Sequence, residues 1–197
     1  MYDARNMLNL LKKCLKIISK QRVLFVLLNW LFFVTMLLAP FFISNHYVES
    51  EDGFFNSSLV RDNALLMVLN IFLFNLLVSA FALMTLTGFL FFAISGVFFL
   101  VRAWFWGALL NGLSTMHLLI VLPTLILEGE GYVLAALAGI DVGLSWLRPQ
   151  SVFKEEGLSR RDAFKRALME CGYIYVLVVF FLFVAAIVET ITLIFLG

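Results

Sequence analysis

Long uncharged apolar runs constrain this chain more than any other feature. Residues 23–44 carry no charged side chain, and residues 63–111 carry a single one, Arg102. About 20 apolar residues in a helix are enough to cross ~30 Å of hydrocarbon. Because 63% of the 197 residues are hydrophobic and only 14% are charged, against ~25% in a soluble domain, the solvent for most of the chain is lipid.

The apolar runs predict an all-α fold, a polytopic membrane helix bundle of about five spans. We expect one transmembrane domain over residues 23–197, with spans at about 23–44, 63–87, 88–111, 131–147 and 173–196. The apolar stretch 113–128 is broken by Pro123 and is predicted as a re-entrant segment, which enters the membrane without crossing it. Residues 159–170 are predicted as a short cytoplasmic helix, because Ser159 and Asp162 form a capping-box-like start.

The distribution of charge predicts the orientation. Residues 1–22 hold six Lys/Arg and one Asp, the loop 148–170 holds six Lys/Arg, and the segment 45–62 is acidic. The positive-inside rule therefore places the N-terminus and the loop 148–170 in the cytoplasm and the C-terminus outside. An even number of crossings must separate the two cytoplasmic segments, which is why 113–128 is not counted as a span. We expect an integral protein of a prokaryotic plasma membrane.

Residues 1–22 also have the apolar period of an amphipathic helix. Its apolar positions are Met7, Leu8, Leu11, Leu15 and Ile18. Two interpretations are open: the helix lies on anionic membrane lipids, or its charges only set the orientation.

Four acidic residues fall within or beside the predicted spans: Glu128, Glu130, Asp141 and Glu189. An ionised carboxylate in hydrocarbon costs at least a few kcal/mol, so each needs a partner. Three explanations are open. Glu128 and Glu130 cap the start of the helix 131–147, or Arg102 pairs with the acids, or the four acids line a hydrated path and bind a cation. Oxygen ligands favour Ca²⁺, Mg²⁺ or a proton relay, and we expect no other cofactor.

Small and polar side chains predict close helix packing. Gly131, Ala135, Gly139 and Gly143 recur every four residues and form a stripe against which another helix backbone can pack. The partner helix lies either in the same chain or in a second subunit of a homo-oligomer. Span 63–87 also carries polar groups that can bond between helices: Asn70, Asn75, Ser79, Thr85 and Thr87.

The search for catalytic motifs is negative. The sequence has no Walker loop, dinucleotide fingerprint, zinc-protease helix or nucleophile elbow. We therefore expect no enzymatic activity and no nucleic-acid partner.

Several stretches resemble the stage II sporulation protein M family of multispan membrane proteins. They cover roughly residues 60–197 and read "IFLFNLLVSAF", "GALLNGL", "LPTLILEGEGYVLAALAGIDVGL", "LSRRDAFKRAL" and "AAIVETIT". The chain keeps the family's Pro123 and Glu128 and has Glu189 at the family's acidic position. It departs at Thr124 and Leu125, where the family usually has His-Gly.

This resemblance implies that Glu128 and Glu189 are the acids of most interest. Bacterial members of the family are implicated in organising peptidoglycan-degrading enzymes at the membrane. Other relatives occur in organisms that do not sporulate, and we expect this chain to be one of them. We expect an oligomeric membrane protein whose acids bind or conduct cations. The alternative is a non-catalytic scaffold that assembles protein partners such as cell-envelope remodelling enzymes.

Overall fold

The computed structural model describes residues 4–42, 63–110, 113–153 and 158–196, and its regular structure there is entirely helical. The helices are α1 (Ala4–Lys20), α2 (Arg22–Phe42), α4 (Ala64–Leu73), η2 (Phe74–Leu86), α5 (Thr87–Leu90), α6 (Phe92–Leu110), α7 (Thr115–Leu147), α8 (Pro149–Phe153) and α9 (Arg160–Leu196). Five segments are long and apolar enough to cross a membrane: α2, Ala64–Leu90, α6, α7 and α9. The predicted helix bundle with five spans is confirmed.

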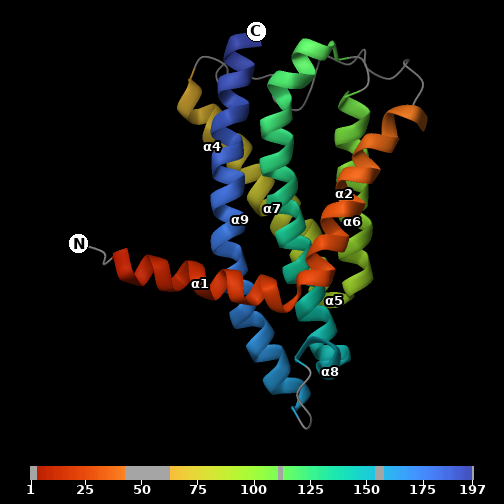
Figure 1. Ribbon diagram of the computed structural model, residues 1–197, viewed down its shortest axis with the longest axis vertical. Coiled ribbons are helices and arrows are strands. Elements are labelled where there is room, and N and C mark those ends of the chain that lie inside the picture. The colour runs from red at the N-terminus through yellow and green to blue at the C-terminus, as the bar shows by residue number, and fades with distance from the viewer. Residues whose placement is uncertain (1–3, 43–62, 111–112, 154–157, 197) are drawn as a thin grey trace.

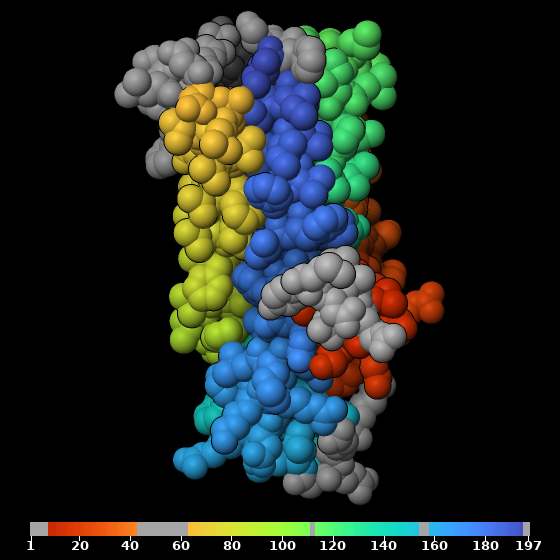
Figure 2. All heavy atoms as spheres, turned by 90° about the vertical axis from the view of Figure 1, so that its left-hand side faces the viewer, coloured from red at the N-terminus to blue at the C-terminus, as the bar shows by residue number. Residues whose placement is uncertain are grey.

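The five long segments run up and down through one bundle (Figure 1). The short helix α8 marks one end, which we call the α8 end, and the C-terminus lies at the opposite one, the C-terminal end. Helix α1 crosses the bundle nearer the α8 end. Figure 2 shows α4 and η2 running beside α9, with which both are in contact.

Helix α7 is the centre of the bundle. Every residue from Gly131 to Gly143 is buried, because α2, η2, α5, α6 and α9 all pack around this helix. Four small residues in this segment permit the close approach. A Cβ added to Gly139 would lie 2.7 Å from the Met84 carbonyl oxygen, and one added to Gly131 would lie 2.7 Å from the Leu182 side chain.

The other two members of this stripe also contact the same chain. A Cβ at Gly143 would collide with the backbone of Gly88, and the Ala135 carbonyl accepts a hydrogen bond from Thr85 Oγ1 at 3.0 Å. The partner of the stripe is therefore η2, α5 and α9 of the same chain. The homo-oligomer stays a prediction.

The predicted re-entrant segment at 113–128 is wrong. Residues 115–147 form one continuous helix, whose first turn is capped by the Ser114 side chain accepting from the His117 N–H at 3.3 Å. Pro123 lies inside this helix without ending it. Proline removes one amide hydrogen bond, whereas unwinding in lipid would leave several backbone groups unpaired. Since 113–128 joins the span predicted at 131–147, the number of crossings is unchanged.

Two further boundaries differ from the predicted ones. The helix predicted at 159–170 and the span predicted at 173–196 form one continuous helix, α9. The predicted capping box is present at its start, where the Asp162 N–H donates to Ser159 Oγ at 3.2 Å. The chain reverses at Phe91, whose backbone is extended, and not at Thr87-Gly88. Gly88 serves instead as the point of contact with α7. The acidic segment 45–62 lies outside the described residues.

Helix α1 docks across α9. Cys14 is fully buried and its Sγ donates to the Tyr173 carbonyl at 3.1 Å, and Lys20 Nζ lies 3.5 Å from the Glu170 carboxylate. Leucines 8 and 15 of the predicted apolar stripe point away from the bundle and are 52% and 61% exposed. The amphipathic helix therefore has one face on the protein and one apolar face free of it.

Candidate functional site

Two of the four predicted acids meet inside the bundle. Glu128 of α7 is fully buried, and its carboxyl group is hydrogen-bonded to that of Glu189 on α9. A carboxylate has only acceptor oxygens, so a hydrogen bond between two carboxyl groups requires a proton on one of them. Two buried carboxyl groups placed in this way can share one proton between them.

The pair lies well inside the membrane-crossing part of the chain. Glu128 follows the start of α7 by 13 residues, or about 20 Å, and Arg102 precedes the end of α6 by 8 residues, or about 12 Å. Both helix ends lie at the C-terminal end of the bundle. The site is thus in the half of the bundle nearer that end.

An arginine balances the charge of the pair without touching it directly. Asn75 donates through Nδ2 to Glu128 Oε1 and accepts through Oδ1 from Arg102 Nη2 at 3.1 Å. The same Nη2 donates to Tyr132 Oη at 2.9 Å, and that hydroxyl is also hydrogen-bonded to Ser79. Five polar side chains from η2, α6 and α7 thus form one network, with α9 joined to it through Glu189.

The local structure of η2 explains how Asn75 and Ser79 reach the site. Residues 74–86 form a π-helix, in which hydrogen bonds run from residue i to i+5 and the helix is wider than an α-helix. Asn75 and Ser79 are both buried and are four residues apart. Both side chains are directed at α7, since each contacts a residue of that helix.

A cavity of about 210 Å³ adjoins the network. It is lined by three polar residues of the network (Asn75, Arg102 and Glu128), by Glu189, and by Ile71, Phe74, Phe105, Trp106 and Leu109. The aromatic rings are close to the charge: the Arg102 guanidinium lies 5.4 Å from the centre of the Trp106 ring and 5.2 Å from that of Tyr132. Such contacts stabilise a buried cation.

Apart from the bond between the two carboxyl groups, four buried polar atoms of the cavity residues lack a hydrogen-bond partner within the described part of the chain. They are Arg102 Nε, Trp106 Nε1, Glu128 Oε2 and Glu189 Oε2, two donors and two carboxyl oxygens. A buried polar group without a partner costs about 1–3 kcal/mol. The concentration of four such atoms around one cavity marks it as the candidate site.

The other two predicted acids lie elsewhere. Glu130 is hydrogen-bonded to Asn29 and so faces α2. Asp141 is 13 residues beyond Glu128, about 20 Å along α7. It is 5% exposed, and neither of its oxygens has a hydrogen-bond partner among the described residues, although Lys20 and Glu170 act on it electrostatically.

These positions bear on two of the explanations for the acids. The proposal that Glu128 and Glu130 cap a helix start is wrong, because α7 begins at Thr115 and both lie within it. Across the described residues, no three His, Cys, Asp or Glu side chains are grouped closely enough to hold a metal ion. A divalent ion held by all four acids therefore has no support within one chain.

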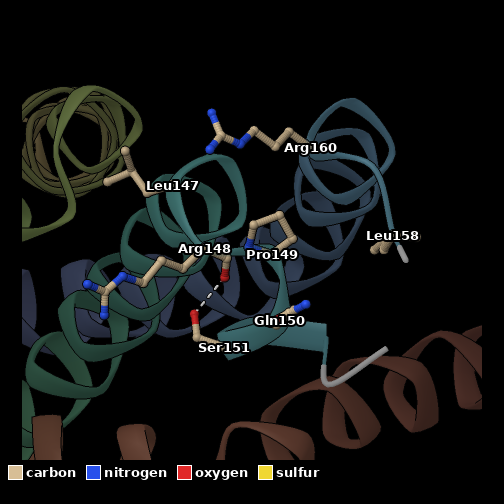
Figure 3. Close-up of a pocket in the computed structure, with 7 residues that line it drawn as sticks. All are labelled: Leu147, Arg148, Pro149, Gln150, Ser151, Leu158 and Arg160. Carbon is tan, nitrogen blue, oxygen red and sulfur yellow. Dashed lines mark hydrogen bonds between the residues drawn. The ribbon is translucent and has the colours of Figure 1, made fainter. Parts of the chain in front are cut away.

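A second hollow, of about 520 Å³, lies at the α8 end (Figure 3). It is lined by Leu147, Arg148, Pro149, Gln150, Ser151, Leu158 and Arg160. The guanidinium groups of Arg148 and Arg160 extend in different directions and do not converge. Within the described part of the chain, none of its lining residues carries an unpartnered buried polar atom. We therefore place the candidate site at the first cavity.

Sequence reasoning identified part of this site. Glu128, Glu189 and Arg102 were predicted, and Asn75 and Ser79 were predicted to bond between helices. Tyr132 and Trp106 were missed, since an aromatic residue in a span is ordinarily a packing residue or an interface anchor. The only signal in the sequence was the helical register: Trp106 is four residues after Arg102 on α6, and Tyr132 is four residues after Glu128 on α7.

Comparison with known proteins agrees with the motifs. The family model for stage II sporulation protein M matches residues 26–192, which include every residue of the candidate site. No curated protein and no solved structure matches the chain. The chain belongs to the stage II sporulation protein M family.

Proposed function

For this member of the stage II sporulation protein M family, we propose that the cation bound within the membrane is a proton, held between Glu128 and Glu189. The observation that carries the proposal is the hydrogen bond between the two buried carboxyl groups. With Arg102 counted, the site is neutral with one proton and would carry a net negative charge without it. The proton therefore completes the charge balance of a region that cannot tolerate excess charge.

The ligand set favours a proton over a divalent metal. Ca²⁺ takes six to eight oxygen ligands and Mg²⁺ needs a near-octahedral set. The site offers two carboxyl groups, and the neighbouring Arg102 would repel a divalent ion. A proton needs only two oxygens within hydrogen-bonding distance. Ionisable groups in spans commonly form proton relays, which agrees with a proton as the bound cation.

Infrared spectroscopy of the protein in lipid tests the proposal. A protonated carboxyl group has a C=O stretching band that a carboxylate lacks. We expect this band at neutral pH in the unmodified protein and a clear decrease of it in both Glu128→Gln and Glu189→Gln. Glu130→Gln is the matched control, because Glu130 lies on the same helix but faces α2. Because the buried Asp141 can contribute a band of its own, a band that neither site substitution weakens would exclude the shared proton.

The orientation is part of the proposal. We propose that the α8 end faces the cytoplasm and that the C-terminus is outside, in a prokaryotic plasma membrane. The basic residues of α1 and of the loop 148–170 support this orientation through the positive-inside rule. The exposed leucines 8 and 15 support a position of α1 in the lipid headgroup layer. The candidate site would then lie in the outer half of the membrane.

A further inference from the structure

The cavity beside the network holds opposite charges on separate groups. Arg102 supplies a positive charge and, with the proposed shared proton, the pair of glutamates supplies one negative charge, while the amide of Asn75 lies between them. No salt bridge joins Arg102 to either carboxylate among the described residues. Apart from the bond between the two carboxyl groups, Arg102 Nε on one side and the two Oε2 atoms on the other have no hydrogen-bond partner among the described residues.

The unpartnered atoms suit a ligand that both donates and accepts hydrogen bonds. Arg102 Nε and Trp106 Nε1 are N–H donors and need an acceptor, ideally an anionic oxygen. The carboxyl pair Glu128 and Glu189 carries a negative charge and needs a donor, ideally an ammonium group. A simple anion or a simple cation would satisfy only half of the site and would upset its charge balance.

The size and position of the cavity limit what can enter. A volume of about 210 Å³ is many times the ~10–15 Å³ that one water needs by the same measure, so the cavity has room for a small organic group. Phe105 and Leu109 line the cavity and are 60% and 57% exposed on the outside of the bundle. Helix α4 packs against α9 and not against α6. The cavity is thus bordered by lipid-facing residues of α6.

We propose that this cavity binds a small zwitterion, with a phosphate or carboxylate group on Arg102 and Trp106 and an ammonium group on Glu128 and Glu189. The inference rests on the proposed function, because the shared proton sets the negative charge of the pair at one. The zwitterion adds no net charge to the site. Its source is either a phospholipid headgroup that enters from the outer leaflet or a free solute of the same chemistry.

Calorimetric titration of the protein in a phosphate-free detergent tests this inference. The probes are glycerophosphoethanolamine, ethanolamine alone, dimethyl phosphate alone, glycine, and short-chain phosphatidylethanolamine. We expect at least one compound with both charges to bind at least tenfold more tightly than ethanolamine or dimethyl phosphate. A lipid source predicts that phosphatidylethanolamine binds more tightly than its soluble headgroup, whereas a solute source predicts that glycine or the soluble headgroup binds at least as well. Equal affinity for the singly charged probes, or no binding of any probe, would overturn the inference.

Substitutions locate the binding. Arg102→Gln and Glu189→Gln should each abolish the preference for zwitterions, and Glu130→Gln should leave it unchanged. Trp106→Phe keeps the ring and removes one N–H, so it should weaken zwitterion binding about tenfold, a loss of about 1.4 kcal/mol, and should leave ethanolamine binding unchanged. This variant decides the question if Arg102→Gln does not fold, and an unchanged affinity would contradict the inference.

The two proposals can fail separately. If the infrared band of the shared proton is present but no probe is preferred, only the zwitterion is excluded. If the band is absent in the unmodified protein, the proton fails, and with it the charge count on which the zwitterion depends.

Discussion

Arg102 and Glu128 are linked through the side chain of Asn75 and not by a direct ion pair. The amide accepts from the guanidinium at 3.1 Å and donates to the carboxylate, so both of its ends are used. This arrangement fixes the orientation of the amide and keeps the two charges apart beside a cavity. It also means that the network depends on a residue with no charge of its own.

Removing this amide should destabilise the bundle. Asn75→Ala leaves the fully buried Glu128 without its donor, and we expect the free energy of unfolding to fall by about 1–3 kcal/mol. Unfolding in mixed micelles, followed by tryptophan fluorescence, measures the change. Asn70→Ala is the matched control, because Asn70 is an exposed residue of the adjoining helix α4. Equal losses in the two variants would show that Asn75 contributes nothing specific.

The close approach of α7 to η2 predicts a contrast between two glycines. Gly139→Ala should destabilise the protein by about 1–3 kcal/mol, because its new methyl group would lie 2.7 Å from the Met84 carbonyl oxygen and 2.9 Å from Thr85 Cα. Gly96→Ala in α6 meets nothing within 4 Å and should be neutral or stabilise the helix by up to about 1 kcal/mol. The melting temperatures of the two variants in detergent test the contrast. A Gly139→Ala variant as stable as Gly96→Ala would contradict the packing of these helices.

The thiol of Cys14 should report whether α1 is docked. Burial of this side chain against α9 raises the pKa of the Cys14 thiol above its usual value near 9.0. In a Cys171→Ser background Cys14 is the only cysteine. Since the thiolate is the reactive form, its alkylation should be slow at pH 8 and should increase only at higher pH than that of the same protein unfolded in detergent.

A substitution in the contact between α1 and α9 should change the rate at which Cys14 is alkylated. Glu170→Gln removes the ion pair with Lys20, which is 30% exposed, and exposed pairs contribute at most about 1 kcal/mol. Alkylation should therefore accelerate by no more than about fivefold. Rapid alkylation of the unmodified Cys14 at pH 8 would show instead that α1 is undocked.

Reporter fusions should establish the orientation. If the positive-inside rule holds for the α8 end, alkaline phosphatase joined after Gly197 should be active in a bacterial host and green fluorescent protein at the same position should be dark. A fusion of each reporter before α1 should give the reverse result and serves as the control. Fluorescence from the C-terminal fusion would invert the proposed topology.

Much of the fold could be predicted from the sequence because lipid imposes simple rules. A run of about 20 uncharged apolar residues has few alternatives to a spanning helix, and the five spans follow from it. The breaks were harder to predict. Pro123 suggested an interruption in α7, but backbone groups in lipid have no water to pair with, so this helix continues. The helix predicted at 159–170 likewise continues into the last span as α9.

The sequence by itself determined the membrane class, the number of spans and the family, and it singled out the two acids that meet at the cavity, since these depend on local composition and on motifs. Only the tertiary structure decided which groups meet. It separated Glu130 and Asp141 from the site, brought Asn75, Tyr132 and Trp106 into it, and placed the partner of the small-residue stripe in the same chain. The physical reason is that helix periodicity gives the face on which a residue lies, whereas the rotation and neighbours of each helix depend on how all the spans pack together.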